Sequence, residues 1–264
     1  MRRRCNYKHI FLICFFLGIT IIISQGYGKE LICDRDAQKT YDRICKYIHD
    51  IRVGRDTAAQ LVKIELALDA YAQKYPGIQN NVVLAYVTAG MLEPYDLDRA
   101  KRMYQQVIDS KDYQYAFPAE STLKQLEWIG KPVSIQFTAI DGKQVDISQM
   151  KGKIILIDFW ATWCHPCVRE IPNIVKLYKK YHKKGLEIIG IDFDEDKELL
   201  TQMIEKKQIP WPQYFDGKQW GNKFGQEFGI TALPTMWLID KTGNVVDVHT
   251  NAGLEDKIRD WLSK

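Results

Sequence analysis

The chain has 264 residues, of which 46% are apolar and 27% are charged, and this composition excludes an intrinsically disordered protein. Four of its 37 Lys and Arg residues lie within the first 28 positions, which contain no acidic residue, so the remainder carries 33 basic groups against 33 acidic ones. That balance leaves no basic field for nucleic acid, and no nucleic-acid partner is expected.

The first 28 residues differ in composition from the rest of the chain. Basic residues at Arg2–Arg4 and Lys8 precede an almost wholly apolar run, Ile10–Ser24, and glycines follow at positions 26 and 28. This order is typical of a secretory signal peptide. An uncleaved N-terminal membrane anchor is the alternative, although the run is shorter than the ~20 residues that span a bilayer. Under either interpretation we expect the rest of the chain in the periplasm or cell envelope, secreted or tethered.

Residues 29–130 have the pattern of a small all-helical domain. In Thr57–Tyr75 the apolar residues recur at steps of three and four, which predicts a helix with one buried face. Asp96 is expected to begin a second clear helix, and Pro118 to lie in the first turn of a third helix that ends at Gly130. The region therefore predicts a helical scaffold, with a partner-binding module as the alternative.

From residue 131 to residue 264 the pattern changes to alternating strands and helices. Two short runs around a turn predict a hairpin, and two continuous apolar runs predict strands buried on both faces. In chain order we expect strands at 133–138, 144–147 and 153–159, a helix at 164–184, a strand at 186–192, helices at 195–206 and 220–228, strands at 235–240 and 245–250, and a helix at 254–263. This order indicates an α/β domain with a mixed central sheet and helices on both faces.

Two cysteines, Cys164 and Cys167, lie where a buried strand is followed by a helix. The unpaired N–H groups and the dipole of a helix N-terminus favour an anion, so the first thiol can ionise there. The thiolate is the attacking species in disulfide exchange, and Cys167, one turn further, can resolve the mixed disulfide. Pro166 lacks an N–H that would be unpaired in the first turn anyway. The alternative is half of a zinc site, but the sequence offers no second pair of ligands at comparable spacing, so no metal is expected.

Two separated motifs in this part of the chain resemble known families. Asp158–Cys167 (DFWATWCHPC) resembles the active-site strand and loop of thioredoxin, and Val168–Pro172 (VREIP) is similar to the extracytoplasmic TlpA/ResA-type reductases of bacteria. Ile230–Thr235 (ITALPT) resembles the cis-proline loop of the same proteins. The resemblance covers residues 131–264 and leaves the helical region uncovered. It implies a thioredoxin-like fold and a thiol–disulfide oxidoreductase that exchanges disulfides with protein substrates.

The resemblance also implies roles for individual residues. Cys164 would be the nucleophile and Cys167 the resolving thiol, and Pro234 would be a cis-proline that lies against the disulfide. Asp158 takes the position of thioredoxin's buried carboxylate, a base for Cys167, whereas TlpA/ResA-type proteins often have an amide there. Glu170 matches an acidic residue near the active site of the second group, with a solvated helix-face glutamate as the alternative. The substrate-binding residues implied are Trp163, His165, Pro166, Leu233 and Pro234.

His165 lies between the two cysteines and has two interpretations. As a cation it would stabilise the Cys164 thiolate and make the disulfide more oxidising. As an exposed and loosely held imidazole it would change little. Strongly oxidising members of the family often have histidine directly before the second cysteine, where this chain has proline, so we expect modest tuning.

Cys33 and Cys45 are a second pair of cysteines in the chain that follows residue 28. Twelve residues of continuous helix would separate them by ~18 Å, beyond the reach of a disulfide. They can form a structural disulfide only if Cys33 precedes the helix and folds back. A second exchange pair and an intermolecular link are the alternatives.

Together these features predict a thiol–disulfide oxidoreductase that acts as a reductant on protein disulfides, without a cofactor. A membrane electron-transfer partner is expected to recharge it. A disulfide-forming oxidase or isomerase of the same fold is the first alternative. Copper delivery is an alternative of another class, for which His249 is available, although copper-binding relatives space their cysteines one residue further apart.

Overall fold

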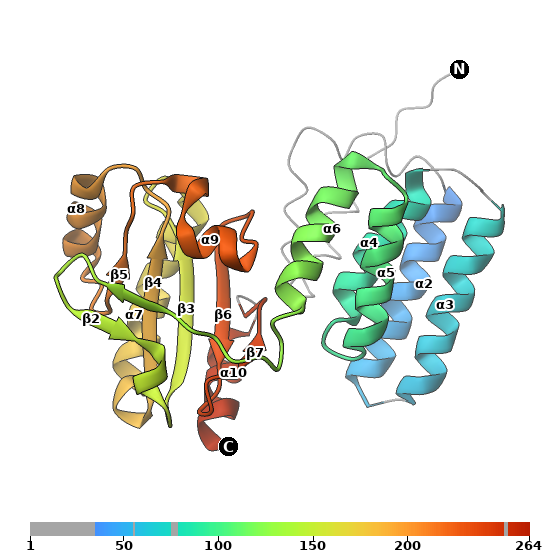
Figure 1. Ribbon diagram of the computed structural model, residues 1–264. Coiled ribbons are helices and arrows are strands. Elements are labelled where there is room, and N and C mark those ends of the chain that lie inside the picture. The colour runs from blue at the N-terminus through green and yellow to red at the C-terminus, as the bar shows by residue number, and fades with distance from the viewer. Residues whose placement is uncertain (1–34, 55, 75–78, 251–252) are drawn as a thin grey trace. The chain divides into compact units, whose positions relative to one another are not determined.

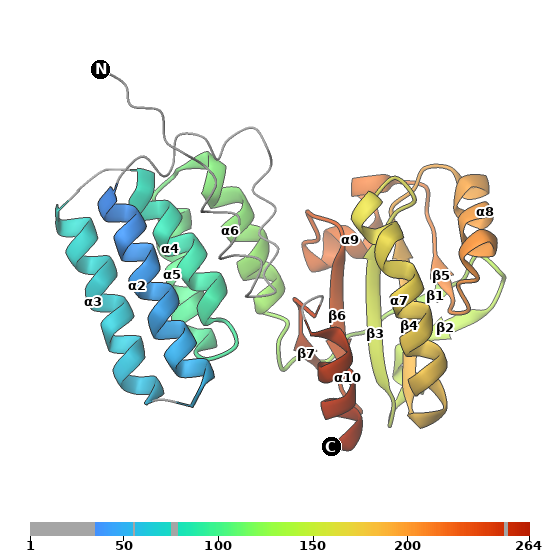
Figure 2. The same cartoon turned by 180° about the vertical axis from the view of Figure 1, so that it is seen from behind.

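The computed structural model describes residues 35–54, 56–74, 79–250 and 253–264. The polypeptide divides into two compact units between Leu123 and Lys124. The first unit is helical, and the second is an α/β unit (Figures 1 and 2). The predictions for residues 1–28 and for Cys33 fall outside the described residues. Among the described helices, none has the length and apolar character to span a membrane.

In the part of the helical unit that the structure describes, there are five helices (Figure 1). Neighbouring helices pack in pairs, with the first against the second and the third against the fourth. The predicted apolar face of the second helix is buried at Leu61, Ile64 and Tyr71. Asp96 caps the fourth helix as predicted, because its side chain accepts a hydrogen bond from the Arg99 N–H at 2.9 Å. The helices are α2 (Arg35–Arg52), α3 (Thr57–Lys74), α4 (Gln79–Leu92), α5 (Leu97–Asp109) and α6 (Tyr113–Leu126).

The prediction for α6 was wrong at both ends. The helix begins at Tyr113, and Pro118 lies inside it rather than in its first turn. Asp112 starts the helix earlier, because its side chain accepts from the Gln114 N–H at 3.1 Å and its carbonyl from the Ala116 N–H at 2.7 Å. Proline in the sixth position removes one helical hydrogen bond, which the helix tolerates. The helix ends at Leu126, before the predicted Gly130.

The α/β unit contains a five-stranded mixed sheet and a separate two-stranded hairpin. In the large sheet the strand order is β5-β4-β3-β6-β7, with β3, β4 and β5 parallel and β6 and β7 antiparallel to their neighbours. All seven residues of β3 are buried, as the continuous apolar run predicts. The strands are β1 (Gln136–Thr138), β2 (Gln144–Asp146), β3 (Ile154–Trp160), β4 (Leu186–Asp192), β5 (Gln213–Tyr214), β6 (Thr235–Ile239) and β7 (Val245–Asp247).

Helices cover both faces of the large sheet, which confirms the predicted architecture. The helices are α7 (His165–Tyr181), α8 (Lys197–Lys207), α9 (Lys223–Phe228) and α10 (Leu254–Ser263). Helix α7 packs on β4 and α10 on β3, both on the face that Figure 2 shows in front. The hairpin and α9 lie on the opposite face (Figure 1), where Phe228 packs against Phe159 and Trp237 with ring centroids 6.3 and 5.2 Å apart.

The segment 124–130 packs with the α/β unit, although the sequence placed the boundary between residues 130 and 131. The Gln125 side chain donates to the Gly229 carbonyl at 3.1 Å. The Trp128 ring lies 5.1 Å from Phe228 and 6.3 Å from Trp237. These contacts explain why the division between the units falls before Lys124.

Candidate functional site

The two cysteines lie at the junction between β3 and α7. Cys164 is the N-cap residue of α7, and its Sγ accepts a hydrogen bond from the Cys167 backbone N–H at 3.3 Å. The two residues form a disulfide in the structure. They are only 5% and 3% exposed, so the disulfide is almost completely buried. The predicted position of the first sulfur at a helix N-terminus is confirmed.

The Leu233–Pro234 loop lies at the same end of the sheet as this junction. The peptide bond between these two residues is cis, and β6 begins at the next residue. Strand β6 is antiparallel to β3, with Thr235 opposite Phe159. The start of β6 is therefore beside the end of β3, and the loop that precedes β6 is at the same edge as the loop that leads to Cys164. Leu233 and Pro234 are half-buried.

Asp158 is a carboxyl group buried inside the sheet. It lies opposite Gly190 of β4 and Met236 of β6, and only 3% of the residue is exposed. Its Oδ1 has no hydrogen-bond partner within the described part of the chain. Burial raises the pKa of this carboxyl to about 7, and the charge of Glu170 adds to the increase. Asp158 can therefore gain or lose a proton near neutral pH.

Glu170 lies in the first turns of α7, three residues after Cys167. Side chains three residues apart share one face of a helix, so Glu170 and Cys167 both lie on the side of α7 near Asp158. Glu170 is half-buried, and its Oε1 accepts from the Asn173 side chain at 2.6 Å. The charge of Glu170 acts on the buried Asp158 carboxyl and helps to raise its pKa.

The remaining residues of the predicted site surround the disulfide. Trp163 is 42% exposed, and its indole N–H donates to the Phe193 carbonyl at 3.4 Å. His165 is exposed and Pro166 is half-buried. Trp160, by contrast, is buried, and its indole N–H donates to Gln213 Oε1 at 2.9 Å. The tryptophans before the cysteines thus divide into one core residue and one surface residue.

Two buried acids that the sequence analysis did not single out hold the loop before Cys164. Asp194 accepts from the Thr162 N–H at 2.9 Å and from the Thr162 hydroxyl at 2.7 Å. Its own N–H donates to Asp192 Oδ1 at 2.9 Å. Burial, together with the hydrogen bond to the Asp194 carboxylate, raises the pKa of Asp192 to about 9. The available signal was two acids at the end of β4, since the carboxyl ends of parallel strands meet at one edge of a sheet.

Trp220 is a second residue that the sequence did not reveal as part of this region. It lies in the 3₁₀ turn Gln219–Gly221, and its ring centroid is 5.8 Å from that of Trp163. The two residues are far apart in the sequence, and no local pattern connects them.

Within the described residues, no group of three or more His, Cys, Asp and Glu side chains is placed to hold a metal ion. His249 follows β7, which is separated from β3 by β6. It is exposed, and its backbone N–H donates to Asp247 Oδ1 at 2.7 Å. Because β3 and β7 are both antiparallel to β6, they run in the same direction, so His249 lies at the same end of the sheet as Cys164, with β6 between their strands.

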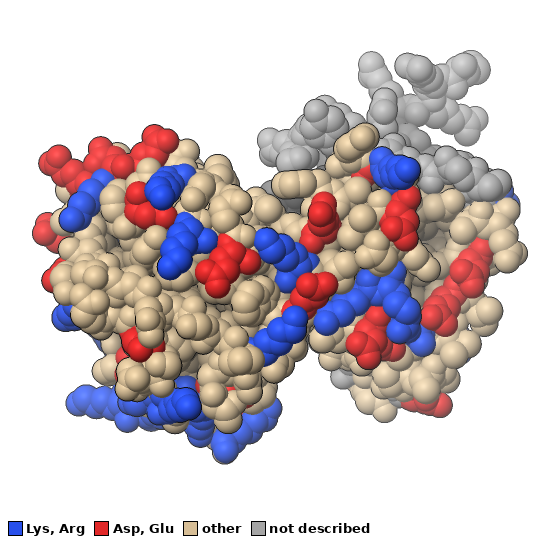
Figure 3. All heavy atoms as spheres, in the orientation of Figure 1, with Lys and Arg blue, Asp and Glu red and all other residues tan. Residues whose placement is uncertain are grey.

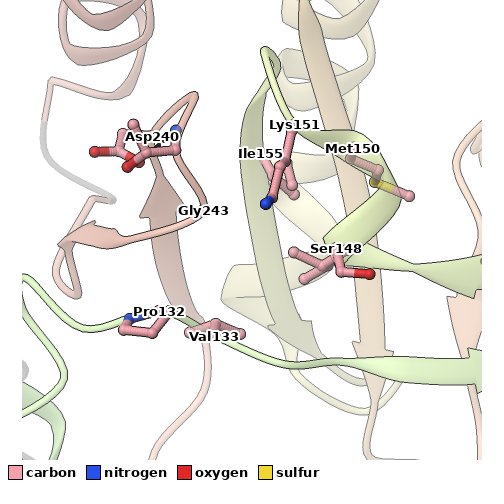
Figure 4. A pocket seen from close by; sticks show the side chains of 10 residues that line it. Pro132, Val133, Ser148, Met150, Lys151, Ile155, Asp240 and Gly243 are labelled. Atoms are coloured by element: carbon pink, nitrogen blue, oxygen red, sulfur yellow. Dashed lines mark hydrogen bonds between the residues drawn. The ribbon is translucent and has the colours of Figure 1, made fainter.

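Two hollows lie away from the cysteine pair. One, of about 180 Å³, lies between Ile155 at the start of β3 and Asp240 after the end of β6, which is the sheet edge opposite to Cys164 (Figure 4). The other, of about 600 Å³, lies within the helical unit and is lined by residues of α3, α4 and α5. Neither contains a residue of the predicted site.

The surface carries charges of both signs. On the face that Figure 3 shows, acidic and basic side chains are interspersed over both units, with one basic group at the lower end of the α/β unit. This distribution agrees with the balance of 33 basic and 33 acidic groups after residue 28.

The comparisons with known proteins agree with this geometry. The Redoxin family model matches residues 125–260. The thiol-disulfide oxidoreductase ResA of Bacillus thuringiensis subsp. konkukian is 32% identical over 153 residues, which cover 58% of this chain and 84% of that protein. ResA of Bacillus subtilis is 30% identical over 123 residues, which cover 47% of this chain and 67% of that protein.

Two solved structures each cover about half of the chain. A thiol:disulfide interchange protein of the thioredoxin family from Chlorobium tepidum is 28% identical, with a TM-score of 0.43, and covers 50% of this chain and 98% of its own. The thioredoxin domain of a thiol-disulfide oxidoreductase from Bacteroides vulgatus is 25% identical, with a TM-score of 0.45, and covers 51% of this chain and 97% of its own. The family model spans residues 125–260, and the Cys164–Cys167 disulfide lies at the N-terminus of α7. The chain therefore belongs to the redoxin family, as a thiol–disulfide oxidoreductase related to ResA.

Proposed function

We propose that this oxidoreductase reduces disulfides of client proteins outside the cytoplasm, with Cys164 as the nucleophile and Cys167 as the resolving thiol. One observation carries the proposal: Cys164 Sγ is at the N-cap of α7 and accepts a hydrogen bond from the Cys167 N–H. A thiolate in this position gains from the unpaired N–H groups and from the helix dipole. The first cysteine is therefore the one that ionises more readily.

The reaction proceeds in two exchange steps. The Cys164 thiolate attacks one sulfur of the client disulfide, which forms a Cys164–client disulfide and releases the other client sulfur as a thiolate that takes up a proton. Cys167 then loses its proton and attacks Cys164 Sγ, which forms the Cys164–Cys167 disulfide and releases the second client thiol. Two electrons pass from the cysteine pair to the client, and the oxidised state is the one in the structure.

Asp158 is the proposed base for the second step. Its pKa of about 7 leaves a substantial fraction of the group as carboxylate at neutral pH, able to accept the Cys167 proton. The carboxyl lies on β3 below the face of α7 that carries Cys167 and Glu170. Glu170 supports this role through its charge, which holds the pKa of Asp158 higher than burial alone would.

Client binding is assigned to the residues that surround the Cys164–Cys167 pair. The loop before β6 and the loop before α7 lie at one edge of the sheet, so a client segment that reaches Cys164 also contacts the cis-proline loop. The exposed His165 and the partly exposed residues near it complete this surface. The proposed contact residues are Trp163, His165, Pro166, Leu233 and Pro234.

The direction of electron flow and the compartment are further parts of the proposal. Proline before the second cysteine, where strongly oxidising relatives often have histidine, favours a reductant. The basic, apolar and glycine-containing order of residues 1–28 favours export or tethering. A reductant in an oxidising compartment requires a supply of electrons, and we assign this supply to a membrane electron-transfer protein.

A trapping experiment tests the assignment of the two cysteines. Reduced Cys167→Ser protein, mixed with a disulfide-linked peptide dimer, should accumulate a Cys164–peptide disulfide that dithiothreitol releases. The matched Cys164→Ser protein should accumulate little. The assignment is wrong if Cys164→Ser forms the adduct and Cys167→Ser does not.

A further inference from the structure

Two exposed indoles lie together beside the reactive cysteine. Trp163 directly precedes Cys164 and is 42% exposed, and Trp220 is 41% exposed. Their ring centroids are 5.8 Å apart. In the described part of the α/β unit, Leu199 is the other large apolar side chain with comparable exposure. Thus two of three such side chains meet at the active site.

Buried neighbours hold both indoles in place. Trp163 donates to the Phe193 carbonyl, and Trp220 packs edge-on against the Phe193 ring with centroids 5.5 Å apart. The Trp220 carbonyl accepts from the Gln226 side chain at 2.6 Å. The fully buried Asn222 fixes the same turn, because its side chain donates to the Asp192 carbonyl at 2.9 Å. An anchored aromatic pair loses little conformational entropy when a partner covers it.

We propose that Trp163 and Trp220 form a binding surface for an aromatic or long aliphatic side chain of the client polypeptide, next to the client's reactive disulfide. This inference rests on the proposed function and adds to it a preference for clients that have such a side chain. The surface is continuous with the site of exchange, because Trp163 is the neighbour of Cys164. Exposed, well-supported tryptophans are typical anchors of protein interfaces. Since an extended chain advances ~3.3 Å per residue, a side chain two or three residues from the client cysteine reaches the pair.

Trp220 is the specificity-determining residue in this proposal. Trp163 belongs to the motif that contains the cysteines, whereas Trp220 comes from a separate turn between β5 and α9. Its removal would take away one of the two exposed indoles and the ring contact between Trp163 and Trp220. The preference for apolar clients should therefore depend on Trp220 more than the exchange chemistry does.

Selectivity between two peptides tests the proposal in the full-length protein. Each substrate is a disulfide-linked dimer of a short peptide, with either Phe or Ser two residues from the cysteine. The wild type should reduce the Phe peptide with a kcat/KM roughly tenfold higher than the Ser peptide. Trp220→Ala should bring this ratio close to one, and Trp220→Phe should keep most of it. Leu199→Ala, which removes an equally exposed apolar side chain, should leave the ratio unchanged.

The outcomes separate this inference from the function on which it rests. If the wild type reduces neither peptide, the proposed function fails. If it reduces both with equal kcat/KM, or if Trp220→Ala lowers both values by the same factor, the exchange function stands and the binding surface is wrong. The reduction potential of each variant, measured alongside, distinguishes a change in client recognition from a change in the disulfide itself.

Discussion

Asp158 shows how one residue links the fold to the chemistry. It lies in a strand whose seven residues are all buried, and a charged carboxylate is costly there. The result is a carboxyl group with a pKa of about 7, in place of the ordinary value of 3.8. The strand that forms the centre of the sheet therefore also supplies the proposed base for Cys167.

Asp158→Asn should remove a pH dependence of stability. The pKa of Asp158 is higher in the folded state than in the unfolded chain, so its contribution is complete below about pH 4 and is lost as the pH rises through about 7. At about 1.4 kcal/mol per pH unit, the wild type loses up to about 4 kcal/mol over this range. Urea unfolding of the oxidised proteins at pH 4.5 and pH 7.5 should show a smaller loss for Asp158→Asn than for the wild type.

The matched control is Asp260→Asn, which replaces an exposed carboxyl on α10. This variant should follow the wild-type pH profile. If Asp158→Asn follows it as well, Asp158 ionises in the folded state at its ordinary pKa and cannot serve as the base.

At the residue scale, the sequence predicted the site residues that belong to short motifs and missed those that join the site from other parts of the chain. Cys164 and Cys167 lie within one motif, and the cis peptide bond before Pro234 was predicted from a second short motif. Trp220 and Asp194 reach the same region only through the fold, by contacts with Trp163 and Thr162. The acids at the end of β4 were a signal for Asp194 that the sequence analysis did not use, whereas no periodicity or spacing connects Trp220 to the site.

At the scale of elements, hydrophobic pattern predicted the long strands and helices and not the shortest strand. Strands β3 and β4 were expected from continuous apolar runs, whereas β5 has two residues, Gln213 and Tyr214, and gives no run. Gln213 is buried where its amide meets Trp160 and the backbone of Gly190. A Cβ at Gly190 would collide with the Gln213 side chain and displace its amide from Trp160, so glycine in β4 makes room for this contact. This tertiary contact is not contained in the strand pattern.

The acids at the end of β4, which hold the loop after β3, lead to a second prediction of pH-dependent stability. Asp192 retains its proton because burial and its hydrogen bond with Asp194 raise its pKa to about 9, so its contribution to stability decreases as the pH rises from about 4 to 9. Above pH 7 the Asp158 contribution is already lost, and Asp192 accounts for the further decrease. Asp192→Asn keeps an amide that can donate to Asp194 and should flatten the urea-unfolding profile between pH 7 and pH 9.

Urea unfolding of Asp158→Asn between pH 7 and pH 9 is the control. Asp158→Asn should still lose stability between pH 7 and pH 9, at up to about 1.4 kcal/mol per pH unit. A profile for Asp192→Asn that falls as steeply as the wild type would contradict the raised pKa of Asp192.

At the scale of the whole molecule, the sequence predicted two regions that meet at residues 130 and 131, whereas the compact units divide between Leu123 and Lys124. The change from helical to strand periodicity at residue 131 is a change of secondary structure, whereas the change of packing partner comes within α6. Gln125 and Trp128 contact the α/β unit, although α6 begins in the helical unit. Packing partners are not encoded in periodicity, which explains the difference.

Two fragments test where the α/β unit begins. The fragment 124–264 contains Trp128, which packs on Phe228 and Trp237, and the fragment 131–264 lacks it. Trp128 is half-buried, so the longer fragment should be more stable by at most about 3 kcal/mol, the cost of removing a large aromatic side chain from a core. Urea unfolding of the two fragments provides the comparison, with Trp128→Ala in the longer fragment as the control. Equal midpoints for all three would place Trp128 outside the folding unit.

The reduction potential of the Cys164–Cys167 disulfide tests the account's central claim most directly. The protein is equilibrated with mixtures of reduced and oxidised glutathione, and the fraction of disulfide is measured at each ratio. A reductant of client disulfides should have a potential near that of thioredoxin, about −270 mV. A value near −120 mV, as in the strongest disulfide-forming oxidants, would contradict the account and make the protein a donor of disulfides.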